Sequence, residues 1–353
     1  MVCFLMTSNN NKKELRDLGE TGIINLIEEL IYKKTKKHLI RDDAFFYELS
    51  NYEKDKSSNQ IILALNTDML VSTTDVPKPM NNFQIGFKSV IMNLSDILVK
   101  GVKPKAILIS LGLPFDLKIH EFKLLMNGII ECCIKYDIEY IGGDVNQTKE
   151  IIINPTIFGV QEKNRILYRK GMKTGDILVT NGKFGLTGVG FDILLKKQKP
   201  FESFKNYQRA INSILNPELS FEGLVLSKHK LASASIDSSD GLAKSLRELI
   251  VSNPGLGFEI KMDDNIMDNE AKKYSEEFDI PLENLIFNGG EEFIHLFTIN
   301  PEKYIRAKKL IQESKGTLLK IGTVIDDSEI YIMNKDKKYN LKIKGYEHFT
   351  QNF

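Results

Sequence analysis

The sequence contains no tryptophan, and only three of its 353 residues are cysteines. Cys132 and Cys133 are neighbours and Cys3 stands apart, so neither a CxxC pair nor a zinc-type spacing is present. We interpret the adjacent pair as core packing in a reducing cytoplasm. The five histidines are scattered, and His120-Glu121 lacks the second histidine of a zinc-binding helix. These absences argue against a thiolate or zinc centre.

An excess of charge of one sign is also missing. The chain has 48 lysines and arginines against 47 aspartates and glutamates, a net charge of +1. This balance creates no field that draws the chain to nucleic acid or to an anionic membrane, so we expect small-molecule partners that are recognised locally. No apolar run approaches membrane-spanning length, and the start MVCFLMTSNNNKK does not fit a signal peptide. We therefore expect a cytoplasmic protein.

The common nucleotide-binding and nucleophile signatures are absent as well. The sequence has no GxGxxG fingerprint, no GK[ST] phosphate loop and no GxSxG motif. We interpret the glycines at 182, 185, 188 and 190 as positions where chain packs closely against chain. A phospho-enzyme intermediate therefore has no obvious carrier in this sequence.

Apolar and charged residues are plentiful, at 42% and 27% of the chain. The length is sufficient for two domains, and we place their boundary near Asn164, giving domains 1–163 and 164–353. Apolar runs predict strands at 61–65, 106–113 and 138–141. Helical spacing between these strands, at 87–98 and 117–136, predicts an α/β (α+β) fold.

The segment from Asn66 to Pro114 carries the most informative pattern. Apolar residues recur at helical spacing from Phe87 to Leu98, and Gly101 follows as a C-terminal cap. Asp96 then lies near the negative end of the helix dipole, which disfavours its charge unless a cation offsets it. The competing interpretation is an ordinary solvated face, because several polar residues share this side of the helix: Ser89, Asn93, Asp96 and Lys100.

Acidic residues follow strand ends at several other places, where open α/β sheets bind their ligands. The acidic candidates are Asp42, Asp68, Asp96, Asp144, Asp237 and Asp240. Such carboxylates, without thiolates or clustered histidines, suit Mg²⁺, which binds oxygen and bridges protein acids to substrate phosphates. Individually the motifs have plainer meanings: RDDA is more often a turn than a metal loop, GGD is equally a turn, and DSSDG is equally a helix N-cap.

Nine short motifs, in order, resemble those of the thiamine-monophosphate kinases, in the superfamily of aminoimidazole ribonucleotide synthetase and selenophosphate synthetase. The motifs are GE at Gly19, RDDA at Arg41, NTDMLV at Asn66, NLSDILVKG at Asn93, GGD at Gly142, GDILVTNGKFG at Gly175, DSSDGL at Asp237, GGEEF at Gly289 and GYEHF at Gly345. The stretch STTDVPKPM with VKGVKP is most similar to the archaeal branch. The resemblance implies a two-domain α/β chain whose N-terminal sheets pair in a homodimer, with ATP over several Mg²⁺ ions.

The resemblance also implies roles for individual residues. Metal ligands would be Asp42, Asn66, Thr67, Asp68, Asp96, Asp144, Asp237 and Asp240. ATP would contact Gly143, Asp144, Arg169 and Ser239. Thiamine monophosphate would contact Asp75, Glu291 and Tyr346. The implied reaction is direct, in-line transfer of the γ-phosphoryl group of ATP to thiamine monophosphate, which gives thiamine diphosphate.

This sequence departs from the family pattern at several motif positions. Arg41 replaces a glycine, Asn66 a serine and Ser238 an apolar residue, Asp75 stands where bacterial members have a histidine, and GGEEF replaces GGEDY. Two alternatives therefore remain open: a related synthetase of the aminoimidazole ribonucleotide type, and a nucleotide-binding regulator that has lost turnover. The second would apply if the changes at Arg41 and Asn66 removed a metal ion.

Overall fold

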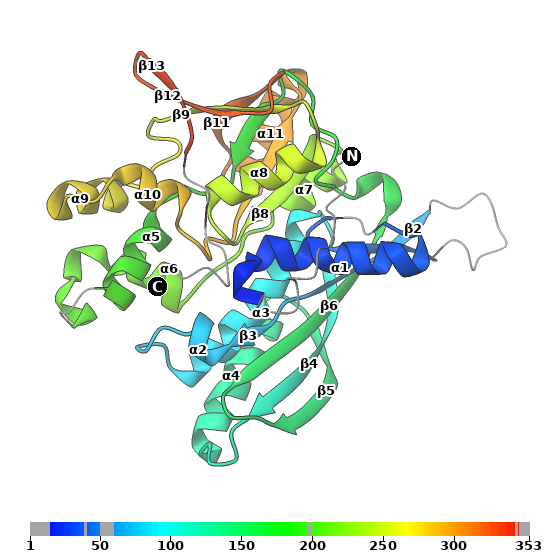
Figure 1. The fold of residues 1–353 in the computed structure, drawn as a ribbon, viewed down its shortest axis with the longest axis vertical. Coiled ribbons are helices and arrows are strands. Elements are labelled where there is room, and N and C mark those ends of the chain that lie inside the picture. The colour runs from blue at the N-terminus through cyan, green and yellow to red at the C-terminus, as the bar shows by residue number, and fades with distance from the viewer. Residues whose placement is uncertain (1–14, 39–40, 50–59, 197–199, 343–344, 346–353) are drawn as a thin grey trace, which may run out of the picture. The chain divides into compact units, whose positions relative to one another are not determined.

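The computed structural model describes residues 15–38, 41–49, 60–196, 200–342 and 345 (Figure 1). These residues divide into two compact units, one within 1–41 and the other within 42–345. The first unit contains a 3₁₀ turn (Leu15–Asp17) and helix α1 (Gly19–Thr35). Within it, Arg41 Nε donates a hydrogen bond of 2.7 Å to Glu28 Oε1.

The first sheet is built from strands that precede residue 163. Its strands are β1 (Phe45–Glu48), β2 (Ile61–Thr67), β3 (Leu70–Val71), β4 (Pro104–Leu113), β5 (Glu139–Gln147) and β6 (Ile152–Glu162). The order is β1-β2-β6-β4-β5, with β3 added to β6, and only β4 and β5 run parallel. Helix α2 (Ser72–Asp75) follows β3, α3 (Asn82–Val99) packs on β2 and β6, and α4 (Ile119–Lys135) packs on α3 and β5.

Helices α3 and α4 approach each other through two glycines. A Cβ at Gly86 of α3 would stand 2.0 Å from the carbonyl oxygen of Leu125, and a Cβ at Gly128 of α4 would stand 1.9 Å from that of Phe83. Side chains at these positions are therefore excluded by the partner backbone. Cys132 and Cys133 lie buried on α4, as predicted, and burial raises the pKa of Cys133 to about 11.

The second sheet is built from strands that follow residue 176. Its strands are β7 (Ile177–Thr180), β8 (Ala232–Ser238), β9 (Gly257–Lys261), β10 (Ile294–Ile299), β11 (Leu319–Ile325), β12 (Ile330–Asn334) and β13 (Lys337–Asn340). The order is β13-β12-β9-β11-β7-β10-β8, and only β9 and β12 run parallel. The predicted boundary near residue 164 falls between the two sheets and remains a prediction.

Helices cover both faces of the second sheet because its strands alternate between two cores. Leu178 and Ile236 pack with α8 (Leu242–Ser252), whereas Val179 and Phe297 pack with α7 (Glu222–Lys228) and α11 (Pro301–Glu313). The remaining helices are α5 (Leu186–Phe191), α6 (Gln208–Leu215), α9 (Asn269–Phe278) and α10 (Leu282–Phe287). Short helical turns occur at Lys163–Arg165, Asp192–Lys196, Phe201–Ser203 and Lys205–Tyr207.

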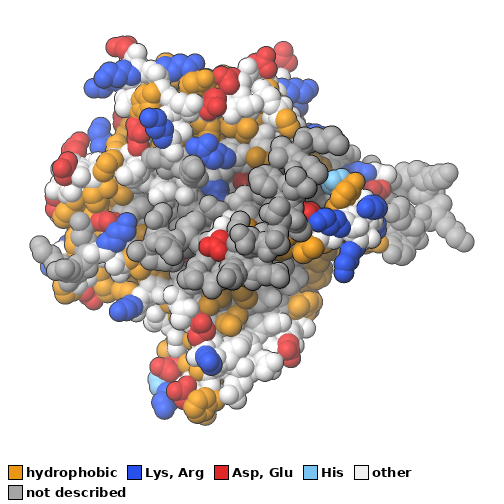
Figure 2. Space-filling model, viewed as in Figure 1, with side chains coloured by type: hydrophobic (Ala, Val, Ile, Leu, Met, Phe, Trp, Pro, Cys, Tyr) orange, Lys and Arg blue, Asp and Glu red, His pale blue; other side chains and the backbone are white. Residues whose placement is uncertain are grey.

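The mixed α/β class predicted from the sequence is confirmed by these two sheets and their helices. Within the described ranges no helix combines the length and apolarity needed to cross a membrane. On the coloured part of the face in Figure 2, basic and acidic side chains are interspersed, in line with the balanced composition.

Candidate metal and phosphate site

The polar side of α3 is buried rather than solvated. Asp96 is 8% exposed, and the other polar residues of this side have no exposed surface: Lys88, Ser89, Asn93, Ser95 and Lys100. The alternative of an ordinary solvated face is therefore wrong. The reason is tertiary, because α3 also contacts β8 and β10 of the second sheet. One helix thus brings polar side chains to the place where elements of both sheets meet.

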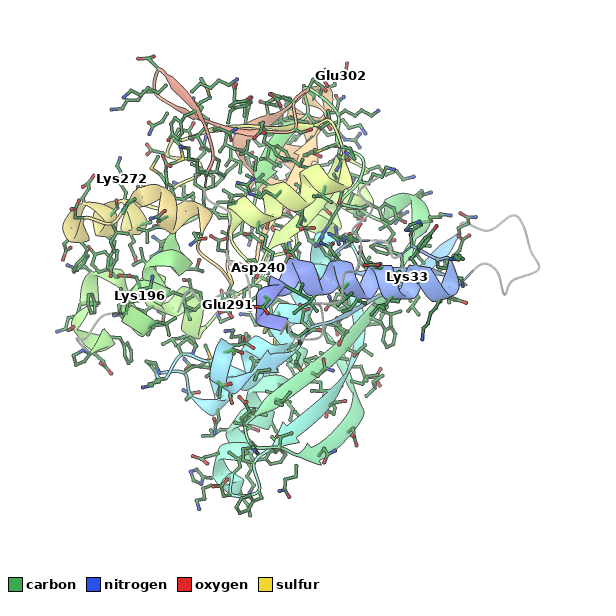
Figure 3. The ribbon with its side chains drawn as sticks, viewed as in Figure 1. Lys33, Lys196, Asp240, Lys272, Glu291 and Glu302 are labelled. Carbon is green, nitrogen blue, oxygen red and sulfur yellow. The ribbon has the colours of Figure 1, made fainter. Side chains whose placement is uncertain are left out.

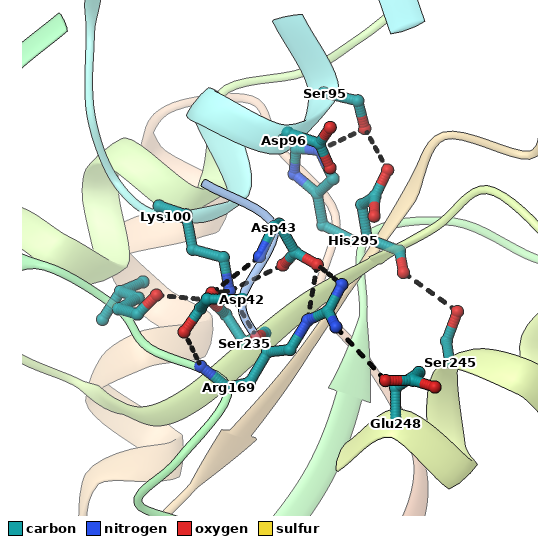
Figure 4. Close-up of polar contacts among 12 residues, drawn as sticks. Asp42, Asp43, Ser95, Asp96, Lys100, Arg169, Ser235, Ser245, Glu248 and His295 are labelled. Carbon is teal, nitrogen blue, oxygen red and sulfur yellow. Dashed lines mark hydrogen bonds and ion pairs between the residues drawn. The ribbon is translucent and has the colours of Figure 1, made fainter. Parts of the chain in front are cut away.

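Three buried carboxylates converge at this place. Asp43 precedes β1, Asp96 lies in the last turn of α3 and Asp237 lies near the end of β8. Each offers a carboxylate oxygen, and these oxygens all lie within 4.8 Å of one another. Figure 4 shows Asp43 and Asp96 in this cluster. Three buried acids this close need a proton or a cation to offset their repulsion.

The pKa values of Asp96 and Asp237 are raised by burial and by this repulsion. Burial raises the pKa of Asp96 well above its ordinary value, and the charges of Asp237, Asp68 and Asp43 raise it further. Burial, with Asp43 as the next cause, raises the pKa of Asp237 to about 7. Both groups therefore hold protons more tightly than ordinary aspartates in the metal-free protein. A divalent cation that displaced those protons would be attracted by the full negative charge of the ionised carboxylates.

Two cationic side chains already balance one side of the cluster. Lys100 Nζ lies 2.6 Å from Asp42 Oδ1 and 2.6 Å from Asp43 Oδ2, and it donates to the carbonyl of Ser235 at 2.8 Å. Arg169 pairs with Asp43 through Nε at 2.7 Å and through its terminal nitrogen. Burial alone would raise the pKa of Asp43, but Arg169 and Lys100 outweigh burial and lower it. Asp43 is therefore the ionised member of the cluster.

Asn66 adds a neutral oxygen to the cluster. Its Nδ2 donates to Asp96 Oδ2 at 2.7 Å and to the carbonyl of Asp43 at 3.0 Å. Its Oδ1 is buried and has no hydrogen-bond partner among the described residues. A buried amide oxygen without a partner costs free energy unless something binds it. Together with the carboxylates it forms an all-oxygen donor set, which fits Mg²⁺.

Asp68 and Thr67 lie beside this cluster at the end of β2. The backbone N–H of Asp68 donates to Asn93 Oδ1 at 2.8 Å, which ties the loop to α3. The charge of Asp68 raises the pKa of both Asp96 and Asp237, so its carboxylate lies near theirs. Thr67 Oγ1 instead donates to the carbonyl of Pro155 at 2.8 Å.

Asp43, beside the predicted ligand Asp42, is the aspartate of this pair that lies closest to the other two carboxylates. The predicted metal set includes Asp42 and omits Asp43. In the structure, Asp43 joins Asp96 and Asp237, whereas Asp42 accepts from the backbone N–H of Arg169 at 3.0 Å and pairs with Lys100. The two adjacent aspartates of RDDA are the sequence feature that could have indicated Asp43 as a site residue.

The predicted nucleotide-binding residues lie on different elements. Gly143 and Asp144 are on β5, where Asp144 is exposed and pairs in register with Ser110 of β4. A Cβ at Gly143, whose φ is +152°, would stand 1.8 Å from the carbonyl oxygen of Ile109, so only glycine fits. Ser239 is exposed in the loop after β8, and Arg169 pairs with Asp43 as described. The structure does not gather these four residues into one contact set.

The predicted acceptor-binding residues include one ion pair. Glu291 lies 2.6 Å from the fully buried Lys88 Nζ, which also donates to the carbonyl of Asp75 at 2.6 Å. The Asp75 carboxylate accepts from the backbone N–H of Val71 at 2.6 Å. Burial is the main cause that raises the pKa of Glu291, and the charge of Asp240, labelled with it in Figure 3, adds to the rise. Tyr346 lies outside the described residues.

Asp240 is the remaining predicted metal ligand. It pairs with Lys244 at 2.8 Å, one helical turn further along the chain. Close packing supports this loop, because a Cβ at Gly345 would stand 3.0 Å from the carbonyl oxygen of Asp240. The structure thus brings together Asp43, Asp96 and Asp237, with Asn66 and Asp68 beside them, and it leaves Asp144 and Asp240 outside that cluster.

The sequence is similar to known proteins over most of its length. The family model described as AIR synthase related protein, N-terminal domain, matches residues 41–161. The chain is 34% identical to the thiamine-monophosphate kinase of Nitrosopumilus maritimus (strain SCM1) over 284 residues, 80% of this chain and 88% of that protein. It is 31% identical to the thiamine-monophosphate kinase of Pyrococcus abyssi (strain GE5 / Orsay) over 326 residues, 92% of this chain and 95% of that protein.

Solved structures extend the comparison to the whole fold. AaThiL complexed with AMPPCP and TMP is 28% identical, has a TM-score of 0.77 and is matched over 96% of this chain and 99% of that one. Thiamine monophosphate kinase from Aquifex aeolicus has a TM-score of 0.74 at 27% identity, over 93% and 99% of the two chains. On its motif order, its two-sheet fold and its identity to these relatives along most of their length, the chain belongs to the thiamine-monophosphate kinase family.

Proposed function

We propose that this protein transfers the γ-phosphoryl group of ATP to the phosphate of thiamine monophosphate, giving ADP and thiamine diphosphate. The observation that carries the proposal is the buried cluster of Asp43, Asp96 and Asp237, which suits Mg²⁺ and phosphate chemistry. The named relatives supply the acceptor, and the solved relative carries AMPPCP and TMP.

We propose Mg²⁺ ligands within and beside this cluster and, for Asp144 and Asp240, outside it. The proposed set is Asp42, Asn66, Thr67, Asp68, Asp96, Asp144, Asp237 and Asp240, to which the geometry adds Asp43. When bound, Mg²⁺ would neutralise phosphate charge and orient the reacting groups. Asn66, which replaces the family serine, still offers an unpaired oxygen beside Asp96, and this supports a metal-binding rather than a regulatory chain.

The charge of the acceptor phosphate and the position of Arg169 favour direct transfer between the two substrates. The acceptor phosphate is already anionic at neutral pH, so no general base is required to deprotonate it. The main barrier is repulsion between two anions, which the guanidinium of Arg169 would reduce while it helps to align the groups. We assign ATP to Gly143, Asp144, Arg169 and Ser239. We assign the acceptor to Asp75, Glu291 and Tyr346, with Lys88 holding the carboxylate of Glu291.

We also propose a cytoplasmic homodimer of two-domain chains, divided near residue 164. The edge strand β5 supports pairing through the first sheet, because Ile141 is 48% exposed and Val145 is 66% exposed there. Unpaired edges with apolar side chains are surfaces that proteins normally cover. Sedimentation of the purified chain tests the dimer directly, and a monomer at micromolar concentration would refute it.

Label transfer tests the reaction. The protein is incubated with γ-labelled ATP, Mg²⁺ and thiamine monophosphate, and products are separated from protein. We expect label in thiamine diphosphate and none retained on the chain. Label released only as inorganic phosphate would favour a synthetase-like reaction. Nucleotide binding without either product would favour a regulator.

A further inference from the structure

His295 is fully buried beside the carboxylate cluster. It lies on β10 directly opposite Asp237 of β8 in the register of the sheet. Burial lowers the pKa of His295 to about 4, so its ring is neutral at physiological pH. A neutral imidazole has one donor nitrogen and one acceptor nitrogen, and the surrounding hydrogen bonds decide which is which.

Ser95 joins His295 to Asp237. Its Oγ lies 3.1 Å from Asp237 Oδ2 and 3.3 Å from His295 Nε2. Figure 4 labels Ser95 and His295. The hydroxyl of Ser95 donates to Asp237 Oδ2, and the Ser95 oxygen can accept from His295 Nε2–H. His295 Nδ1 is buried and has no hydrogen-bond partner among the described residues, which agrees with its being the unprotonated nitrogen.

Packing alone does not explain this pair of residues. The other buried side chains of β10 include Leu296, Phe297 and Ile299, so an apolar residue would suit this strand. A buried imidazole with one unpaired nitrogen costs free energy relative to such a residue. The compensating feature is the directed chain of hydrogen bonds, which ends on a carboxylate of the cluster.

We propose that Ser95 and His295 are positioning residues for Asp237. Together they fix one of its two carboxylate oxygens and thereby set how the carboxylate faces a Mg²⁺ ion held with Asp43 and Asp96. Groups that orient a metal ligand in this way are typically worth about 10- to 100-fold in metal affinity. The inference rests on the Mg²⁺ site of the proposed function but not on the identity of the acceptor.

Calorimetric titration of the full chain with Mg²⁺, without nucleotide, tests the proposal. His295→Gln places an amide nitrogen where Nε2 stands, whereas His295→Asn places its amide where the unused Nδ1 stands. We expect His295→Gln to retain the Mg²⁺ affinity within about threefold, and both His295→Asn and Ser95→Ala to weaken it by about tenfold or more. Ser227→Ala is the matched control, because Ser227 is also a fully buried helical serine that donates one hydrogen bond, to the carbonyl of Arg165 at 2.7 Å.

Melting in EDTA establishes that each variant is folded before titration. Wild-type Mg²⁺ affinity in folded Ser95→Ala would overturn the proposal, as would equal weakening by His295→Gln and His295→Asn. If His295→Asn does not fold, the comparison of Ser95→Ala with Ser227→Ala decides the question. A wild-type protein that binds Mg²⁺ but makes no thiamine diphosphate would count against the proposed function only.

Discussion

Asp96 is the residue at which the metal-free site is most strained. It is buried, its negative neighbours raise its pKa, and it lies in the last turn of α3, where the helix dipole also disfavours a negative charge. Removing its charge relieves all three effects. The hydrogen bond from Asn66 can persist, because an asparagine side chain keeps an acceptor oxygen.

We therefore predict that Asp96→Asn raises the melting temperature in EDTA at pH 8 and lowers turnover by more than about a hundredfold, because Mg²⁺ loses a ligand. Calorimetry and a coupled ADP assay measure the two effects. Asp116→Asn, in an exposed loop, is the charge-matched control and should change neither. A clear fall in melting temperature would instead make Asp96 a structural residue.

Glu292 is a second buried acid whose protonation matters. Its Oε2 accepts from Ser238 Oγ at 2.5 Å, its Oε1 has no partner among the described residues, and burial raises its pKa well above the ordinary value. For an acid whose pKa rises on folding, the stabilising contribution is complete below the unfolded pKa of about 4.3 and is lost as pH rises through the folded value.

We predict that Glu292→Gln, which is neutral at every pH, stabilises the metal-free protein, and that the gain grows from pH 6 to pH 8. Urea denaturation in EDTA at the two pH values measures it. Glu313→Gln, on the exposed side of α11, should give no pH-dependent gain. An equal effect of Glu292→Gln at both pH values would show that the carboxyl does not titrate in this range.

Sequence patterns could predict Asp96 and Asp237 as partners, because helix ends and strand ends are assigned from apolar spacing. They could not choose between Asp42 and Asp43, since the choice depends on where Lys100 and Arg169 reach from distant parts of the chain. The same limit hid Ser95 and His295, which are 200 residues apart and meet only through tertiary packing.

At the scale of elements, α3 shows what apolar spacing leaves undecided. Its apolar stripe correctly predicts a helix that ends before Gly101, but the stripe does not reveal that the polar side is buried too. The sequence pattern also missed β9 and α9. In α9 only Ala271 and Tyr274 are buried, too few for a recognisable apolar stripe.

Lys88 of α3 connects the end of α2 to the loop before β10 of the second sheet. It holds the carboxylate of Glu291 and the carbonyl of Asp75 from a fully buried position. Replacing Lys88 leaves the Glu291 carboxylate without its cation. Breaking one side of a buried ion pair typically costs about 3 kcal/mol or more.

We predict that Lys88→Met lowers stability by about 3 kcal/mol and raises the KM for thiamine monophosphate more than the KM for ATP. Steady-state kinetics and urea denaturation test the two parts. Lys103→Met removes an exposed ion pair with Asp137 and should leave stability almost unchanged, because exposed ion pairs contribute little. Equal rises in both KM values would contradict a role specific to the acceptor.

At the scale of the whole molecule, the proposed metal binding would be coupled to proton release. The pKa of Asp237 is raised to about 7 and that of Asp96 well above its ordinary value, so the metal-free fold loses stability as pH rises through these values. In the proposed site, Mg²⁺ would bind the deprotonated cluster and restore that stability.

We predict that about 5 mM Mg²⁺ raises the melting temperature only slightly at pH 5.5. At pH 8 we expect the rise to be several-fold larger. Differential scanning calorimetry at a series of pH values measures it, with K⁺ at equal ionic strength as the control. A Mg²⁺ effect that is independent of pH would mean that no group of raised pKa is displaced.

The contact between α3 and α4 at two glycines restricts how these helices can move against each other. Packed helices can slide past one another by small shear movements only where side chains can change partners, and here backbone meets backbone at Gly86 and Gly128. The helix pair therefore has a single register and moves as one rigid body with the first sheet. Asp96, in the last turn of α3, is therefore held at a fixed position relative to the first sheet.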